Sequence, residues 1–199
     1  MNEIATKRQL PRTTQAAEGL PRWRWTTSEL ERIAEMGAFT SEDRFELIGG
    51  EIVPMSPRGR LHEVLREMLE RSWRRMLPDG YSITAEPQFN LGDDTYSIPD
   101  LLVLPASMKA YDLRGADALL VVEIADTSLA YDRDTKAKTY ARFGVREYWV
   151  INARTLETKM HLEPGENGYA SIVTKAGDTL LTPTLAAWLV VRLADLDLD

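Results

Sequence analysis

Residues 119–152 read LLVVEIADTSLAYDRDTKAKTYARFGVREYWVIN. An apolar run at 119–125 opens this stretch, and a mostly apolar run at 146–151 closes it. Continuous apolar runs of this length are typical of strands that are buried on both faces of a sheet. Between the two runs, residues 132–143 have apolar side chains at helical spacing and precede Gly144, a common helix terminator. The stretch therefore predicts a buried strand, a helix and a second buried strand in succession.

Further elements are expected on both sides of this stretch. Thr26–Glu29 has the pattern of a capping box and predicts a helix that turns Leu30, Ile33 and Ala34 inward and ends at Gly37. Residues 92–94 are expected to form a turn. The other expected elements are a hairpin of 45–48 and 51–53, a helix over 58–77 with Leu61 on its apolar face, strands at 81–86, 88–91 and 98–104, and C-terminal hairpin strands at 155–162 and 169–175.

The order of these elements predicts one mixed α/β domain, in which a central mixed sheet is flanked by helices. An N-terminal helix precedes the core and β-hairpins follow it. Residues 1–21 are polar, contain two prolines and lack an apolar face, so we expect them to form a flexible N-terminal arm. Residues 22–199 are then expected to form a single domain.

Composition narrows the chemistry that the chain can perform. There are no cysteines and only two histidines, which excludes disulfides, zinc-thiolate sites and thiol catalysis. A metal would be held mainly by oxygen atoms, as magnesium or manganese prefers. No apolar run is long enough to span a membrane and the N-terminus lacks a secretory apolar segment, so a cytoplasmic protein is expected. The net charge of −7 argues against a broad surface for nucleic acid but leaves room for a local basic groove.

Two carboxylates lie in unexpected surroundings. Glu123 interrupts the apolar run at 119–125, and Asp100 follows Pro99 at the start of the apolar segment 98–104. Buried carboxylates are rare unless they are paired or bind a metal. If the two strands are neighbours, the carboxylates converge and can hold a hard divalent cation. A structural ion pair for Glu123 and a turn at Pro99-Asp100 are the alternatives.

Longer segments resemble a known protein family. These are FELIGGEIVPMSP at 45–57 with His62 after it, IPDLLVL at 98–104, and the block from 120 to 152. In order and spacing they resemble the bacterial Uma-two family, which lies within the PD-(D/E)XK restriction-endonuclease-like superfamily. The resemblance runs from about residue 26 to the C-terminus. It implies a restriction-endonuclease-like core and Mg²⁺-dependent hydrolysis of phosphodiester bonds in nucleic acid. DNA is the expected substrate, with RNA as the alternative.

The resemblance also implies which residues act. Asp100 and Glu123 match the two acidic positions that bind Mg²⁺, with Mn²⁺ as a second possible ion. The parent pattern has a lysine two residues beyond the glutamate, where this chain has Ala125. In this family a lysine of the following helix takes its place, and Lys136 stands at that position. Lys138 is the competitor, because helical geometry puts both lysines at the edges of the apolar stripe.

For other residues the sequence leaves more than one role open. Glu46 stands at an acidic position of the family and is expected to complete the catalytic site, with an outward strand position as the alternative. His62 would contact phosphate or water, or else serve as a cap or a surface residue. Asp126 would be a loop or capping residue or a ligand through water. We expect Tyr140 to pack in the core, and Gln88 carries no assigned role.

The sequence thus favours a metal-dependent endonuclease with Asp100, Glu123, Lys136 and Glu46 as its catalytic residues. A homodimer is expected, because cutting both strands requires two sites. The main alternative is a catalytically impaired member that binds nucleic acid or serves in assembly, which Ala125 and the acidic charge would favour. A different metal-dependent hydrolase is disfavoured, because no histidine-rich or nucleophile-elbow motif is present.

Overall fold

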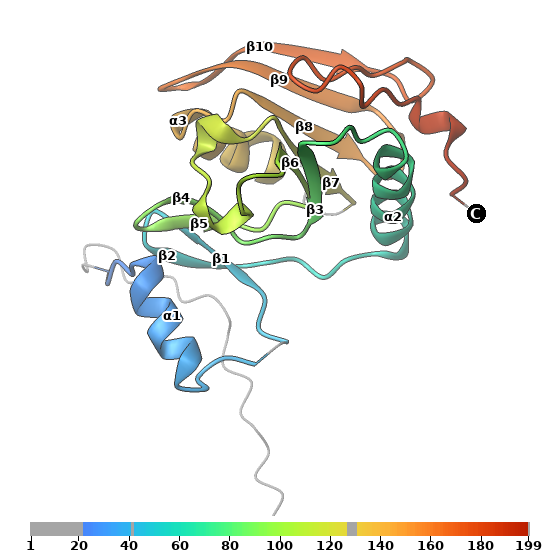
Figure 1. Ribbon diagram of the computed structural model, residues 1–199. Helices are drawn as coiled ribbons and strands as arrows, with labels where there is room; N and C mark the ends of the chain where they lie inside the picture. The colour runs from blue at the N-terminus through green and yellow to red at the C-terminus, as the bar shows by residue number, and fades with distance from the viewer. Residues whose placement is uncertain (1–21, 41, 127–130, 199) are drawn as a thin grey trace, which may run out of the picture.

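The computed structural model describes residues 22–40, 42–126 and 131–198. Ten strands in these ranges form two sheets, which are covered by three α-helices (Figure 1). The larger sheet has the strand order β10-β9-β8-β7-β6-β3, and the smaller has the order β2-β1-β5-β4. In the larger sheet only β7 and β8 are parallel, so this sheet is mixed. The predicted class, a mixed sheet flanked by helices, is confirmed.

The elements lie close to the ranges that the sequence predicts. The helices are α1 (Thr27–Glu35), α2 (Arg60–Arg74) and α3 (Ala137–Arg142), and a π-helical turn, η3 (Tyr131–Lys136), runs directly into α3. The strands are β1 (Phe45–Ile48), β2 (Glu51–Pro54), β3 (Tyr81–Ala85), β4 (Phe89–Gly92), β5 (Thr95–Ser97), β6 (Leu101–Pro105), β7 (Leu120–Ala125), β8 (Glu147–Asn152), β9 (Thr158–Gly165) and β10 (Gly168–Lys175). Short 3₁₀ turns are η1 (Ala110–Asp112), η2 (Gly115–Asp117) and η4 (Leu193–Asp195).

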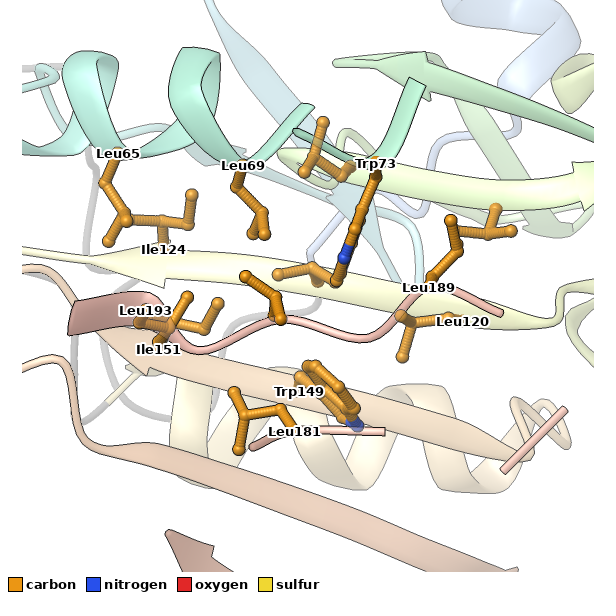
Figure 2. Close-up of a cluster of buried hydrophobic side chains, with 14 of the residues drawn as sticks. Leu65, Leu69, Trp73, Leu120, Ile124, Trp149, Ile151, Leu181, Leu189 and Leu193 are labelled. Carbon is orange, nitrogen blue, oxygen red and sulfur yellow. The ribbon is translucent and has the colours of Figure 1, made fainter. Parts of the chain in front are cut away.

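Helix α2 and the segment after β10 cover one face of the large sheet. Leu65, Leu69 and Trp73 point from α2 toward β7 (Figure 2). Leu189 and other residues of the C-terminal segment enter the same cluster. Trp73 is fully buried, and an aromatic side chain of this size makes one of the largest apolar contributions to a core. Helix α3 packs on the opposite face, where Tyr140 is buried.

Alternation along β7 decides which side chains meet the α3 face. Val122 and Ile124 belong to the α2 cluster, whereas Val121 and Ala125 belong to the α3 cluster. Successive side chains of a strand point to opposite faces, so Glu123 points to the α3 side. All six residues of β7 are buried, as the continuous apolar run predicts. The buried carboxylate is therefore directed toward α3 and η3.

The pairing of β6 with β7 brings the two predicted carboxylates to the same place. The strands are antiparallel, with Leu101 opposite Val122. Continuing this register by one residue puts Asp100 opposite Glu123 on the same face. The condition for convergence of the two carboxylates, that their strands are neighbours, is therefore met. Because the crossover from β7 to the parallel β8 passes through η3 and α3, it carries Lys136 over this end of the sheet.

The small sheet contains the predicted hairpin and packs against α1. Hairpin β1–β2 forms as predicted, and both Gly49 and Gly50 have positive φ. A Cβ at Gly50 would meet Arg24 at 2.9 Å, so the close approach of that segment requires glycine. Helix α1 begins with the predicted capping box and lies beside β1 and β2 (Figure 1), where Leu30 packs on Leu47 of β1.

Several details differ from the sequence-based expectations. The expected turn at 92–94 is shorter, because Gly92 ends β4 and Thr95–Ser97 form the additional strand β5. Ala34 is exposed instead of buried. Leu61 is 43% exposed, because α2 turns His62 inward in its place. The predicted arm at 1–21 lies outside the described residues. None of the helices in the described ranges has the length and apolar character needed to cross a membrane.

His161 of β9 is buried among aromatic rings. We expect it to make the stability of the folded protein sensitive to acid. It lies next to Tyr148 and Tyr169, and neither ring nitrogen has a hydrogen-bond partner among the described residues. Burial, and then the charge of Lys159, lower the pKa of His161 to about 4. The folded state therefore requires the neutral ring, whereas the unfolded chain takes up a proton below its usual pKa of 6.5.

We expect the stability supplied by neutral His161 to be complete above about pH 6.5 and to be lost as the pH falls through about 4, a change of about 3 kcal/mol. His161→Phe keeps an aromatic ring without a proton to gain. Urea unfolding of both proteins across this range should therefore give a difference in stability that grows on acidification. A constant difference would contradict the assignment.

Candidate active site

A cavity of about 440 Å³ opens where the two sheets, α2 and η3 meet. Five carboxylates line it, from Glu46, Asp100, Glu123, Asp126 and Asp132. The lysine and arginine side chains that line it are those of Lys136, Arg44 and Arg58, and His62 lines it as well. Negative groups thus outnumber permanent positive groups. Such an excess of carboxylate oxygens favours a bound cation.

Lys136 and Glu123 form the buried centre of the cavity. Lys136 Nζ lies 2.9 Å from Glu123 Oε1 and 3.1 Å from Glu46 Oε1. Asp132 Oδ1 lies 3.7 Å from the same nitrogen. Tyr140 donates its hydroxyl proton to Glu123 Oε1 at 3.0 Å. All of these side chains are buried, so one ammonium group serves several carboxylates away from water.

Asp100 is fixed from two directions. Its Oδ2 accepts the backbone N–H of Ile124 at 2.6 Å, and its Oδ1 lies 2.9 Å from His62 Nε2. The first contact ties Asp100 to β7 beside Glu123, and the second ties it to α2. Glu46 is held in a similar way, because its Oε1 accepts the backbone N–H of Ile98 at 2.9 Å. Fixed carboxylates of this kind are pre-organised for a ligand.

The pKa values of both partners of the central pair are raised, for different reasons. Burial raises the pKa of Glu123 well above its usual value, and the charge of Lys136 offsets only part of that rise. Burial alone would lower the pKa of Lys136, but the negative charges of Glu123 and Glu46 raise it well above its usual value. Lys136 therefore keeps its proton at neutral pH.

The pKa of His62 is also raised by a neighbouring carboxylate, that of Asp100. Burial alone would lower the pKa of His62, but the hydrogen bond and the negative charge of Asp100 raise it. Burial, followed by the charge of Glu123, raises the pKa of Tyr140 well above its usual value, so its hydroxyl remains a donor. The cavity thus combines fixed acceptors with fixed donors.

The donor set fits a hard divalent cation. Mg²⁺ takes oxygen ligands and is commonly held by one or two carboxylates together with water and substrate phosphate. Asp100 and Glu123 face the cavity from neighbouring strands and offer such oxygens. Within the described ranges no three acidic or histidine side chains are gathered closely enough to hold a metal by themselves. Asp100 and Glu123 are therefore the residues that could hold such a cation, together with water and substrate oxygens.

The structure brings together four residues that the sequence singles out: Asp100, Glu123, Lys136 and Glu46. Lys138 is exposed and lies elsewhere, near Gly168. Glu46 is 1% exposed, which contradicts the alternative of an outward strand residue. The geometry thus separates the two lysines that helical spacing leaves open.

The remaining candidates divide between the cavity and its surroundings. Gln88 does not line the cavity and donates to Asn90 instead. Asp126 lines it and pairs with Arg154, with 2.6 Å between Oδ1 and Nε. Asp126 also lies against Gly59 before α2, where a Cβ would collide with its carboxylate. It is therefore a loop residue packed on a helix N-terminus, where negative charge is favoured.

Some residues that contact or line the cavity could not be assigned to the site from the sequence. Tyr140 packs in the core as expected, but its hydroxyl also contacts Glu123. Asp132, Arg44 and Arg58 reach the cavity without being part of any recognisable sequence pattern. A spacing of four residues between Asp132 and Lys136 is the one signal that could have linked this aspartate to the site.

The fold and the paired carboxylates define a restriction-endonuclease-like protein. The sequence pattern of the Uma2 family, described as "Putative restriction endonuclease", matches residues 27–194. The chain belongs to this family. Its fold is similar to that of a solved structure described as a "putative nuclease belonging to DUF820" from Anabaena variabilis ATCC 29413, with a TM-score of 0.62. The two are 16% identical over 82% of this chain and 95% of the other. No curated protein matches the chain.

Proposed function

We propose that the protein is a metal-dependent endonuclease that hydrolyses phosphodiester bonds in nucleic acid, with DNA as the expected substrate. The observation that carries this proposal is the meeting of Asp100, Glu123 and Lys136 at one cavity. Membership of a family described as "Putative restriction endonuclease" supports the same reaction class. A homodimer would supply the second site needed to cut both strands.

The proposed roles follow from chemistry at each position. Asp100 and Glu123 would hold Mg²⁺ or Mn²⁺, which when bound supplies an activated water and neutralises charge on the phosphate. Lys136 keeps its proton, so it would act as a positive charge that orients water or stabilises negative charge, and not as a base. Glu46 would hold the Lys136 ammonium group in position from β1. His62 and the Ile124 N–H would keep the Asp100 carboxylate facing the cavity.

A supercoiled plasmid tests the activity. Wild-type protein is expected to nick it with Mg²⁺ or Mn²⁺ and to lose that activity in EDTA. Calorimetry should detect binding of Mn²⁺, and Asp100→Asn should weaken that binding by at least about tenfold. Asp93→Asn, on the exposed turn between β4 and β5, is the matched control and should leave both readouts unchanged. Nicking that is insensitive to both EDTA and Asp100→Asn would refute the assignment.

A second candidate is a member of the family that binds nucleic acid without cutting it. Ala125 favours this reading, because it is buried where the parent pattern has its lysine. The same calorimetric titration separates the two functions. Absence of Mn²⁺ or Mg²⁺ binding at millimolar concentration, together with retained nucleic-acid binding, would favour the non-catalytic member.

A further inference from the structure

Two arginines at the cavity converge on one carboxylate. Arg44 and Arg58 both line the cavity, and both pair with Glu86 Oε1. Arg44 Nη2 lies 3.5 Å from that oxygen, and Arg58 contacts it directly through Nη2. Glu86 does not line the cavity itself. Its carboxylate therefore approaches the two guanidinium groups from outside the cavity.

Glu86 is held close to Asp100 by the backbone. Its N–H donates to the carbonyl oxygen of Asp100 at 3.2 Å, just beyond the end of the β3–β6 pairing. Its φ of 51° lies in the left-handed region, which costs a residue with a side chain about 1–2 kcal/mol. Strained residues of this kind gather at functional sites. The hydrogen bond to Asp100 thus holds Glu86, and with it the arginine pair, next to the proposed metal ligand.

The side chains of this cluster are partly exposed, so a ligand can reach them. The side chains of Arg44, Arg58 and Glu86 are 33%, 23% and 25% exposed. Partly exposed ion pairs contribute up to about 1 kcal/mol. A phosphate group that reaches both guanidinium groups can accept several hydrogen bonds in the fork geometry that arginine favours. Phosphate can therefore compete with a single carboxylate oxygen.

The charge of the cavity favours such a group for an anionic substrate, in addition to a bound cation. Five carboxylates repel a nucleic-acid backbone, and Lys136 is already engaged by Glu123 and Glu46. Arg44 and Arg58 are the remaining arginine or lysine side chains on the described cavity wall. Phosphates supply most of the affinity of proteins for nucleic acid, through contacts of this type.

We propose that Arg44 and Arg58 form a subsite for a backbone phosphate of the nucleic acid, and that Glu86 occupies it as an internal anion until the substrate takes its place. The subsite rests on the proposed function in one respect, because its occupant is the nucleic acid that the cavity would cut. Arg58 is also close to Glu63, with 3.4 Å between Nε and Oε1. That second pair keeps the guanidinium group at the cavity wall when Glu86 is displaced.

Binding in the absence of metal tests the subsite separately from cleavage. The probe is a short fluorescein-labelled duplex DNA in EDTA, followed by anisotropy over a series of salt concentrations. Arg44→Gln and Arg58→Gln should each weaken binding by about tenfold and reduce the slope of log K against log salt by about 1. Arg58→Lys should keep the slope. Arg75→Gln, on the exposed C-terminal end of α2, is the matched control and should resemble wild type.

Glu86→Gln separates the proposed subsite from a purely structural role more clearly than the arginine variants do. It keeps the size and backbone of Glu86 but removes the competing charge, so DNA should bind up to about fivefold more tightly. A purely structural role predicts equal or weaker binding. Thermal unfolding verifies that each variant is folded. A labelled single-stranded RNA run in parallel identifies which nucleic acid the subsite prefers.

The outcomes separate this proposal from the nuclease assignment. Unchanged salt slopes in both arginine variants, with wild-type cleavage intact, would overturn the subsite alone. Altered slopes without any metal-dependent cleavage would support the subsite and remove the nuclease. If wild-type protein bound neither DNA nor RNA in EDTA, the subsite would be overturned, whereas the nuclease assignment would fail only if metal-dependent nicking were also absent.

Discussion

Replacing Lys136 with methionine is expected to lower the free energy of unfolding by about 3–5 kcal/mol, the usual cost of removing one partner of a buried ion pair. Lys136 Nζ contacts Glu123 at 2.9 Å and Glu46 at 3.1 Å, and both carboxylates are buried. Methionine has a similar length and supplies apolar contacts but no charge. The carboxylates would then have to take up protons or remain charged without this ammonium group.

Lys138→Met is the matched control for this variant. Lys138 is exposed on α3, two residues beyond Lys136, so its replacement should change stability by at most about 0.5 kcal/mol. Urea unfolding at neutral pH measures both variants, and plasmid nicking should be lost in Lys136→Met alone. Equal stability of the two methionine variants would show that Lys136 is not the counterion of the cluster.

A second substitution should restore part of the stability lost in Lys136→Met. Glu123→Gln removes one of the negative charges that Lys136 balances, so the double variant should be more stable than the two single effects predict when added. Nicking should remain absent in the double variant. Additive changes in stability would mean that the two side chains do not interact in solution.

The strands that carry the site could be predicted, because strands buried on both faces have nearly continuous runs of apolar residues. β7 and β8 are nearly continuous apolar runs, and a carboxylate inside one of them, Glu123, is conspicuous. The neighbour of β7 could not be derived with the same certainty, since pairing with β6 depends on tertiary contacts. β5 was missed because three residues are too few to establish an alternation.

The choice between Lys136 and Lys138 shows a different limit of prediction from helical periodicity. An α-helical projection puts both at the edges of the apolar stripe, but Tyr131–Lys136 form a π-helical turn. Its i→i+5 hydrogen bonding shifts the angular position of each residue relative to α3. Lys136, the last residue of that turn, enters the cavity, while Lys138 on α3 is exposed. The family resemblance identified the buried lysine where periodicity could not.

The inward position of His62 and the pairing of the two arginines could not be derived from helical periodicity, for another reason. The apolar residues of α2 allow more than one inward face, and the actual face includes His62 and Trp73 in place of Leu61. His62 is tolerated there because Asp100 accepts its hydrogen bond. Likewise, Arg58 meets Glu86 only through the folded arrangement of α2 and β3. Polar contacts between distant segments leave no periodic trace in a sequence.

Glu123→Gln is expected to reduce plasmid nicking by at least about 100-fold while the protein remains folded. Tyr140 can still donate its hydroxyl proton to the amide oxygen of glutamine, and Lys136 keeps its contact with Glu46. Burial raises the pKa of Glu123 above its usual 4.5, so ionisation of this group costs folding free energy as the pH rises through its value in the folded state. Glutamine resembles the neutral acid and avoids that cost.

The stability of Glu123→Gln at neutral pH should therefore equal or exceed that of wild type, in contrast to Lys136→Met. Measuring nicking rate and urea unfolding on the same samples separates a chemical role from a structural one. An inactive but unfolded variant would assign Glu123 to the core, and a folded variant with full activity would remove it from the metal site. Loss of activity together with retained stability is the result that a metal-binding carboxylate requires, because such a group is selected for its charge at the expense of folding free energy.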